Sequence, residues 1–238
     1  MSRATDRAAR RAALSGSGPT RDDGAPPARF PGARSAFGLL GEVLLVGVLI
    51  ALVSIPIVTL PAGLAAGIRH LRRFLKAESS SIGAFWSDVR ASLLGGIGVG
   101  VGSLVLVLVL VLDIDLANSG ALPGGPLVGA VGWLGLAALA LALFTAAGRW
   151  TPGTGWIGAL RSVPGAVAAD PIGAAYLVAT AVFAAVVTWQ LLPLVVPALG
   201  CVALAIVAVP ERPRRGHVPA DHESGADDAS SATSAPRA

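Results

Sequence analysis

The stretch that decides the fold is residues 171–210, which read PIGAAYLVATAVFAAVVTWQLLPLVVPALGCVALAIVAVP. It carries no charged side chain, lies between Asp170 and Glu211, and is interrupted near its middle by Pro193 and Pro197. A helix rises about 1.5 Å per residue and the hydrocarbon core of a bilayer is about 30 Å thick, so one crossing needs roughly twenty residues. The stretch therefore predicts two membrane spans joined by a tight turn.

The composition of the whole chain agrees with a membrane protein. Hydrophobic residues make up 54% of it and charged residues 13%, and soluble domains carry about twice that share of charge. The single cysteine, Cys201, excludes an internal disulfide, and His70, His217 and His222 have no spacing typical of a metal site or a catalytic triad. We expect no enzymatic activity, no cofactor, no metal and no nucleic-acid partner.

We predict an all-α polytopic membrane domain over residues 36–210, flanked by a disordered basic tail at 1–35 and a second disordered tail at 211–238. Charge-poor runs of bilayer length predict five spans, at about 37–60, 91–112, 127–147, 172–190 and 194–209. A broken stretch at 151–170 predicts a short interfacial turn of helix.

The loop after the first predicted span contains a basic stripe, formed by Arg69, Arg72, Arg73 and Lys76. Their spacing of i, i+3, i+4 and i+7 places them on one helical face, and leucine and isoleucine occupy another. This pattern predicts an amphipathic helix that lies in the headgroup plane. The stripe either binds anionic lipid headgroups or serves only to set the topology, and the two roles are compatible.

The distribution of basic residues predicts the topology, because cytoplasmic loops are enriched in Lys and Arg. The loops at 61–90 and 148–171 and the start of the C-terminal tail are basic, whereas the loop near Asn118 has only Asp113 and Asp115 beside it. Five spans then place the N-terminus outside and the C-terminus inside, with Trp150 and Trp189 in the aromatic belts. The seven arginines of the N-terminal tail disagree. The alternative is a re-entrant hairpin at 37–68, which leaves both tails inside.

Glycines open the predicted second span, at Gly96, Gly98, Gly100 and Gly102. Small residues spaced four apart allow a second helix to approach closely. We expect a helix of the same chain to pack there rather than a second copy of the protein: the first span, through Gly47 and Ala51, or the third, through Gly132 and Gly135.

Acidic residues offer few other candidate sites. Glu42, the one acid within a predicted span, is either a proton or ion relay or a group that reaches the interface. Asp113 and Asp115 either collect cations or form a polar helix end, and Asp170 before Pro171 is expected to cap the fourth span.

A set of residues between Ser54 and Arg90 forms a family-like pattern: Pro56-Ile-Val-Thr59, Pro61, Ala65-Ala66, Arg69, Arg72-Arg73, Glu78, Phe85-Trp86 and Arg90. The pattern resembles the YesL-like family of bacterial membrane proteins, for which no activity is established. The resemblance implies a five-span protein of the bacterial plasma membrane, linked to carbohydrate-uptake loci, with no catalytic residues to carry over. Two functions remain open: an accessory or regulatory membrane component beside an uptake system, or a small solute transporter or channel.

Overall fold

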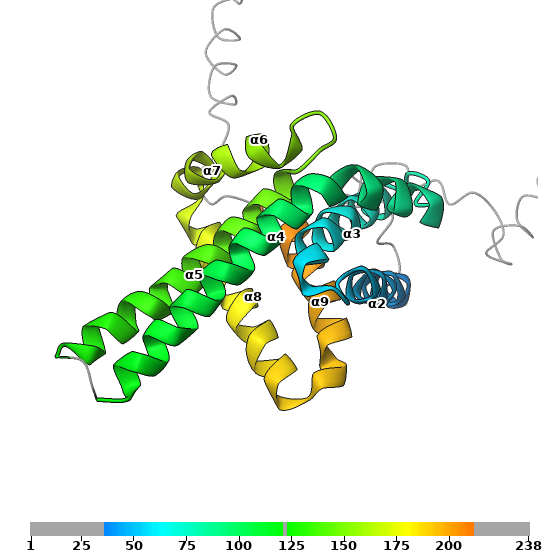
Figure 1. The fold of residues 1–238 in the computed structure, drawn as a ribbon. Coiled ribbons are helices and arrows are strands. Elements are labelled where there is room, and N and C mark those ends of the chain that lie inside the picture. Colours follow the sequence, from blue (N-terminus) through cyan, green and yellow to red (C-terminus); the bar gives the residue numbers. More distant parts are fainter. Residues whose placement is uncertain (1–35, 121–122, 212–238) are drawn as a thin grey trace, which may run out of the picture.

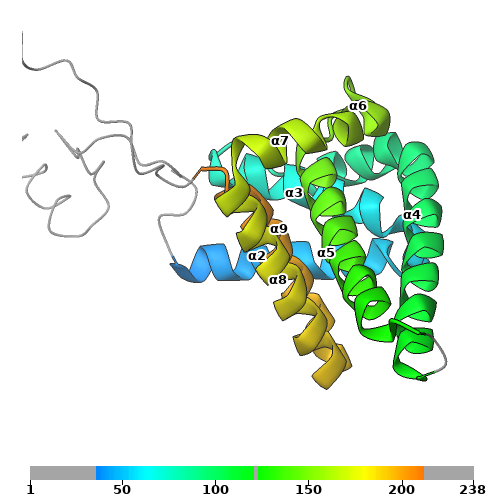
Figure 2. The ribbon, with the colours of Figure 1, turned by 90° about the vertical axis from the view of Figure 1, so that its left-hand side faces the viewer.

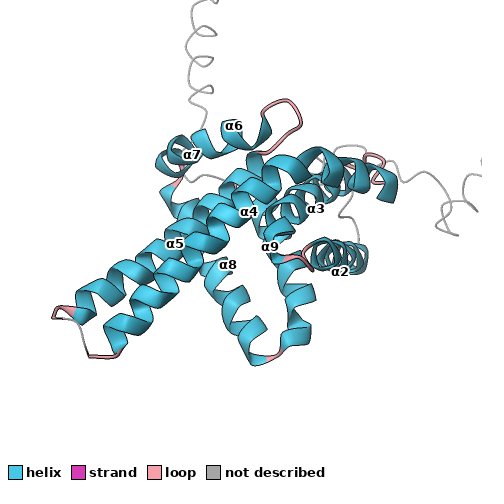
Figure 3. Ribbon diagram, in the orientation of Figure 1, coloured by secondary structure: helices cyan, strands magenta, loops and turns pink. Residues whose placement is uncertain are grey.

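The structure, a computed structural model, describes residues 36–120 and 123–211, and every regular element in these ranges is a helix (Figure 3). The predicted all-α fold is confirmed for them. Most of the two predicted disordered tails, at 1–35 and 212–238, lies outside the described residues.

Two long helical hairpins dominate the molecule. The first joins α4 (Ile82–Asn118) to α5 (Gly125–Arg149), and the second joins α8 (Pro171–Gln190) through the short η3 (Leu192–Leu194) to α9 (Val195–Ala208). Both project in the same general direction from a layer of shorter helices (Figure 1). Three helices, α4, α5 and α8, are long and apolar enough to cross a membrane, whereas α9 and α2 (Ala36–Val53) are shorter apolar helices. The expected count of five spans stays a prediction.

The first predicted span, 37–60, is wrong in its last seven residues, 54–60. Helix α2 ends at Val53, the chain turns through η2 (Ile57–Thr59), and α3 (Leu60–Leu75) runs back along α2. The reversal has a local cause, because Pro56 lacks the N–H that a continuing helix would need. The Thr59 hydroxyl closes the turn: it lies within hydrogen-bond distance of the carbonyls of Val53 and Pro56, and its one hydrogen is shared between them.

The α2–α3 hairpin is antiparallel and closely packed. A Cβ on Gly67 would lie 2.6 Å from the Ile50 side chain, and one on Gly63 would lie 3.1 Å from Ser54 Oγ. The hairpin runs across the direction of α8 and α9 (Figure 2). There Gly47 meets the carbonyl of Val196, so backbones touch where α2 crosses α9.

The second predicted span, 91–112, lies within a much longer helix. Helix α4 begins at Ile82, where the Ser81 side chain caps it by accepting from the Ala84 N–H at 3.2 Å. Trp86 and Asp88, expected in a loop, therefore lie on the first turns of α4. The predicted third and fourth spans correspond to α5 and α8, and the interfacial turn at 151–170 forms α6 (Gly155–Arg161) and α7 (Val163–Ala169).

Helix α3 forms where the amphipathic helix was expected, but protein covers its apolar face. Leu64, Ile68, Leu71 and Leu75 are all buried, in a core shared with α2, α5 and α9. This core lies where α2 and α3 meet α5, α8 and α9.

Candidate functional site

The four residues of the basic stripe lie in three different environments. Arg69 and Arg73 lie one turn apart and both reach Asp88 on α4, with Arg69 Nε 3.1 Å from Oδ1 and Arg73 Nη2 2.5 Å from Oδ2. The Asp88 side chain is only 7% exposed, so this carboxylate needs its two cationic partners. Arg72 points elsewhere, into a cavity, and Lys76 is exposed at the helix end. The expected headgroup contact of the whole stripe stays a prediction, now limited by the ion pairs of two of its members.

A second polar pair links the two helices of the α2–α3 hairpin. His70 Nε2 lies 2.8 Å from Glu42 Oε1, and the His70 side chain is 1% exposed. Its Nδ1 atom has no hydrogen-bond partner among the described residues, and the Phe85 ring meets the imidazole edge to face. Glu42 is therefore held inside the protein by His70, an arrangement that neither sequence reading of Glu42 included.

Two tryptophans, Trp150 and Trp156, connect Arg69 to α6. The Arg69 guanidinium lies 5.8 Å from the centre of the Trp150 ring, within the range of a cation–π contact. Trp150 in turn lies 6.3 Å from Trp156, whose Nε1–H donates to the Ser92 carbonyl at 2.9 Å. Trp150 is 1% exposed, so its expected place in an aromatic belt is wrong: the ring packs inside the protein. Trp189, the other belt candidate, is 86% exposed.

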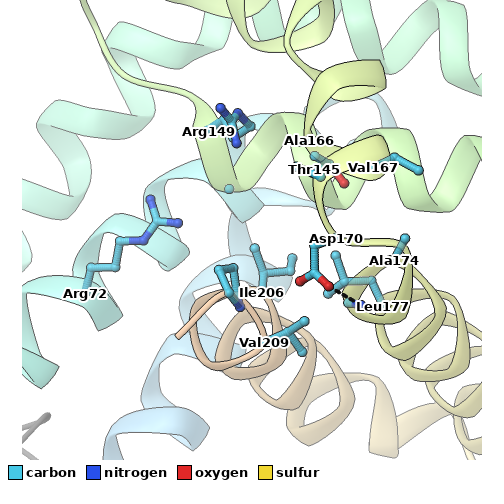
Figure 4. Close-up of a pocket in the computed structure, with 14 residues that line it drawn as sticks. Arg72, Thr145, Arg149, Ala166, Val167, Asp170, Ala174, Leu177, Ile206 and Val209 are labelled. Carbon is cyan, nitrogen blue, oxygen red and sulfur yellow. Dashed lines mark hydrogen bonds between the residues drawn. The ribbon is translucent and has the colours of Figure 1, made fainter. Parts of the chain in front are cut away.

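A cavity of about 250 Å³ opens beside the Arg72 side chain of α3. Its walls come from the last turns of α3, α5 and α9, from α7 and from the first turns of α8. In Figure 4, Arg72 and Arg149 approach it from one side, and Asp170 lies opposite them. Burial is the largest cause that lowers the pKa of Arg72; the positive charge of Arg69 lowers it further and Glu211 opposes the shift.

Asp170 caps α8, as the sequence predicts. Its Oδ1 accepts from the Gly173 N–H at 2.9 Å. The N-terminus of α8 is therefore already supplied with a carboxylate, which leaves the arginines as the anion-seeking groups of the cavity.

The glycines of α4 fall into two pairs. Gly96 faces Ala62 of α3 and Gly100 faces the carbonyl of Val58 in η2, both too close for an added Cβ. A Cβ added at Gly98 or Gly102 would meet no atom of the described residues within 4 Å. The expected partners were different: Gly47 contacts α9, while Gly132 and Gly135 pack on Ile114 and Leu110, farther along α4.

The remaining candidates stay apart. Pro56, Thr59 and Pro61 lie at the turn of the α2–α3 hairpin, Phe85 is buried on α4, and Trp86 and Arg90 are exposed there. Asp113 and Asp115 lie at the far end of α4, and His217 and His222 lie outside the described residues. Within the described ranges, no three His, Cys, Asp or Glu side chains gather as a metal site would require.

Asp88 was missed because it was read as a loop residue. Phe85, Asp88, Val89 and Ser92 repeat at helical spacing, and all are buried on one face of α4. That spacing was the available signal.

Comparison with known proteins adds no relative: no family model, no curated protein and no solved structure matches the chain. The fold itself defines a helical protein with three helices able to cross a membrane.

Proposed function

We propose that the chain is a multi-pass protein of the bacterial plasma membrane with both tails in the cytoplasm. In this arrangement the α4–α5 and α8–α9 hairpins cross the bilayer, and the α2–α3 hairpin enters and leaves on the cytoplasmic side. The observation that carries it is the antiparallel packing of α2 on α3, in which Glu42 lies beside His70. The start of α2 and the end of α3 therefore lie at the same end of the hairpin.

The charges of the sequence support this topology. All eighteen Lys and Arg residues lie in 1–90, 149–161 and 212–238. Four crossings with a re-entrant hairpin place every one of them on the cytoplasmic side, as the positive-inside tendency requires. Five crossings would leave the seven arginines of the N-terminal tail outside.

The proposed role is that of an accessory or regulatory component, beside a solute-uptake system, without enzymatic activity. A conduit for polar solutes needs polar lining, yet residues 91–112, 127–148 and 171–210 contain no charged side chain. Three of the charges that the described residues bury instead bind one another, with Asp88 joined to Arg69 and Arg73. They brace the re-entrant hairpin against α4.

The link to carbohydrate uptake rests on the resemblance of Pro56–Arg90 to the YesL-like family, and membership of that family is part of the proposal. The test is affinity purification of the tagged full-length protein from its native membrane in mild detergent. We expect subunits of an uptake system to be recovered in fixed proportion. Recovery of the protein alone, together with release of entrapped sugar from proteoliposomes that contain only this protein, would contradict the accessory role.

A transporter is the second candidate, because the cavity beside Arg72 and Arg149 has room for a small solute. The proteoliposome measurement decides between the two.

A further inference from the structure

We propose that the cavity between α3, α5, α7, α8 and α9 binds a phosphate ester, and that Arg72 and Arg149 are the residues that hold the phosphate. The occupant we favour is the headgroup of a glycerophospholipid from the inner leaflet. This assignment of source rests on the cytoplasmic placement proposed above, whereas the phosphate chemistry does not.

The first argument is that neighbouring arginines of α3 differ in whether they have an acidic partner. Arg69 and Arg73 are neutralised by Asp88, but the side chain of Arg72, on the same helix, forms no ion pair or hydrogen bond with any described residue. It is nevertheless half-buried in the cavity wall. A desolvated guanidinium without an acceptor is unfavourable, and a phosphate supplies acceptors in the geometry that arginine binds best.

The second argument is that another arginine, from a different helix, lines the same cavity. Arg149, the last residue of α5, lines the same cavity and also has no acidic partner among the described residues. The guanidinium of Arg72 lies over the last turn of α5, with Nη2 3.8 Å from where a Cβ on Gly148 would be. Two cations from elements far apart in the sequence therefore line one cavity (Figure 4).

The nearby carboxylates limit how much negative charge a ligand of this cavity can carry. Asp170 lies across the cavity with one oxygen bound to the Gly173 N–H, and Glu211 is close enough to act on Arg72. A carboxylate opposite two arginines disfavours a polyanion and suits a ligand of low net charge, such as a phosphodiester.

The third argument is the rest of the wall. Leu177, Ile206 and Val209 give it an apolar side, which a bare inorganic ion would not use. At about 250 Å³ the cavity is smaller than the roughly 300–1,000 Å³ of drug-sized sites. A cavity of this size suits a headgroup rather than a whole lipid, and the acyl chains would remain in the bilayer.

The experiment uses the purified full-length protein in detergent and measures retained lipid by native mass spectrometry. The probes are phosphatidylglycerol, diacylglycerol, which lacks the phosphate, and glycerol 1-phosphate as a soluble competitor. We expect Arg149→Gln to weaken phosphatidylglycerol retention about tenfold, as the loss of a charge-assisted hydrogen bond predicts. Arg72→Gln should do the same, and Arg161→Gln, an exposed control on α6, should have no effect.

Competition by glycerol 1-phosphate would support recognition of the phosphate ester itself. Retention of phosphatidylglycerol without such competition would support a lipid as the source. Equal retention by Arg149→Gln and Arg161→Gln, or equal binding of diacylglycerol, would overturn the proposal. Arg149 is exposed, so its variant keeps the test valid if Arg72→Gln fails to fold. The assay does not depend on sidedness, so its failure is distinguishable from failure of the proposed topology.

Discussion

His70 Nε2 lies 2.8 Å from Glu42 Oε1, although the two residues are 28 positions apart in the chain. The contact joins the beginning of α2 to the end of α3, and it exists only because the chain reverses at Pro56. The contact forms only if α3 folds back along α2, as in a re-entrant hairpin; a single straight span would keep the two residues apart.

Glu42→Leu should destabilise the protein, because it leaves the Nε2 atom of the buried His70 without a partner. The expected cost is about 1–3 kcal/mol, seen as a lower thermal unfolding temperature in detergent. Glu42→Gln keeps an oxygen acceptor and should recover most of the loss. If the leucine and glutamine variants unfold at the same temperature, the hydrogen bond does not contribute.

Asp88→Asn should loosen the contact between α3 and α4. Removing the charge leaves Arg69 and Arg73 without their counter-ion, and because they are 27% and 20% exposed, we expect only about 1–3 kcal/mol. Asp113→Asn, at the far end of α4, is the control. Chemical denaturation in mixed micelles measures both, and similar midpoints would contradict a bracing role for Asp88.

Gly100→Ala and Gly98→Ala should behave differently, although the two glycines are equivalent in the sequence pattern. An added Cβ at Gly100 collides with the Val58 carbonyl, whereas one at Gly98 meets nothing within 4 Å. We expect a clear loss of folded yield and a lower aggregation temperature for the first variant only. A tolerated alanine at position 100 would show that η2 does not pack on α4.

Trp156→Phe should cost about 1–3 kcal/mol, because the indole N–H that donates to the Ser92 carbonyl is lost and the smaller ring fills the buried site less completely. Trp133→Phe, at a position 65% exposed, is the matched control. Thermal unfolding of the two variants measures the difference, and an equal effect would argue against the α4–α6 contact.

The helical hairpins were predictable because their signals are local. Charge-free runs of span length, with Pro171 opening α8 and polar turns between runs, are sufficient to outline α5 and α8. The reversal at Pro56 was also encoded locally, but an apolar run continues through it, so the length of the run suggested one span. Long-range pairs had no such signal. Nothing near Asp88 in the sequence indicates that it pairs with Arg69 and Arg73. Arg72 and Arg73 have different partners only because Arg73 faces Asp88 of α4, whereas Arg72 faces the cavity beside the end of α5.

The measurement that tests the topology most directly is accessibility of single cysteines at Ser17→Cys, Ser80→Cys and Ser119→Cys, each in a Cys201→Ser background. An impermeant thiol reagent is applied to intact cells and then to permeabilised cells. With both tails inside, position 119 reacts in intact cells, and positions 17 and 80 react only after permeabilisation. Labelling at position 17 in intact cells, with position 80 protected, would show that the first helix crosses the membrane and would contradict the re-entrant hairpin.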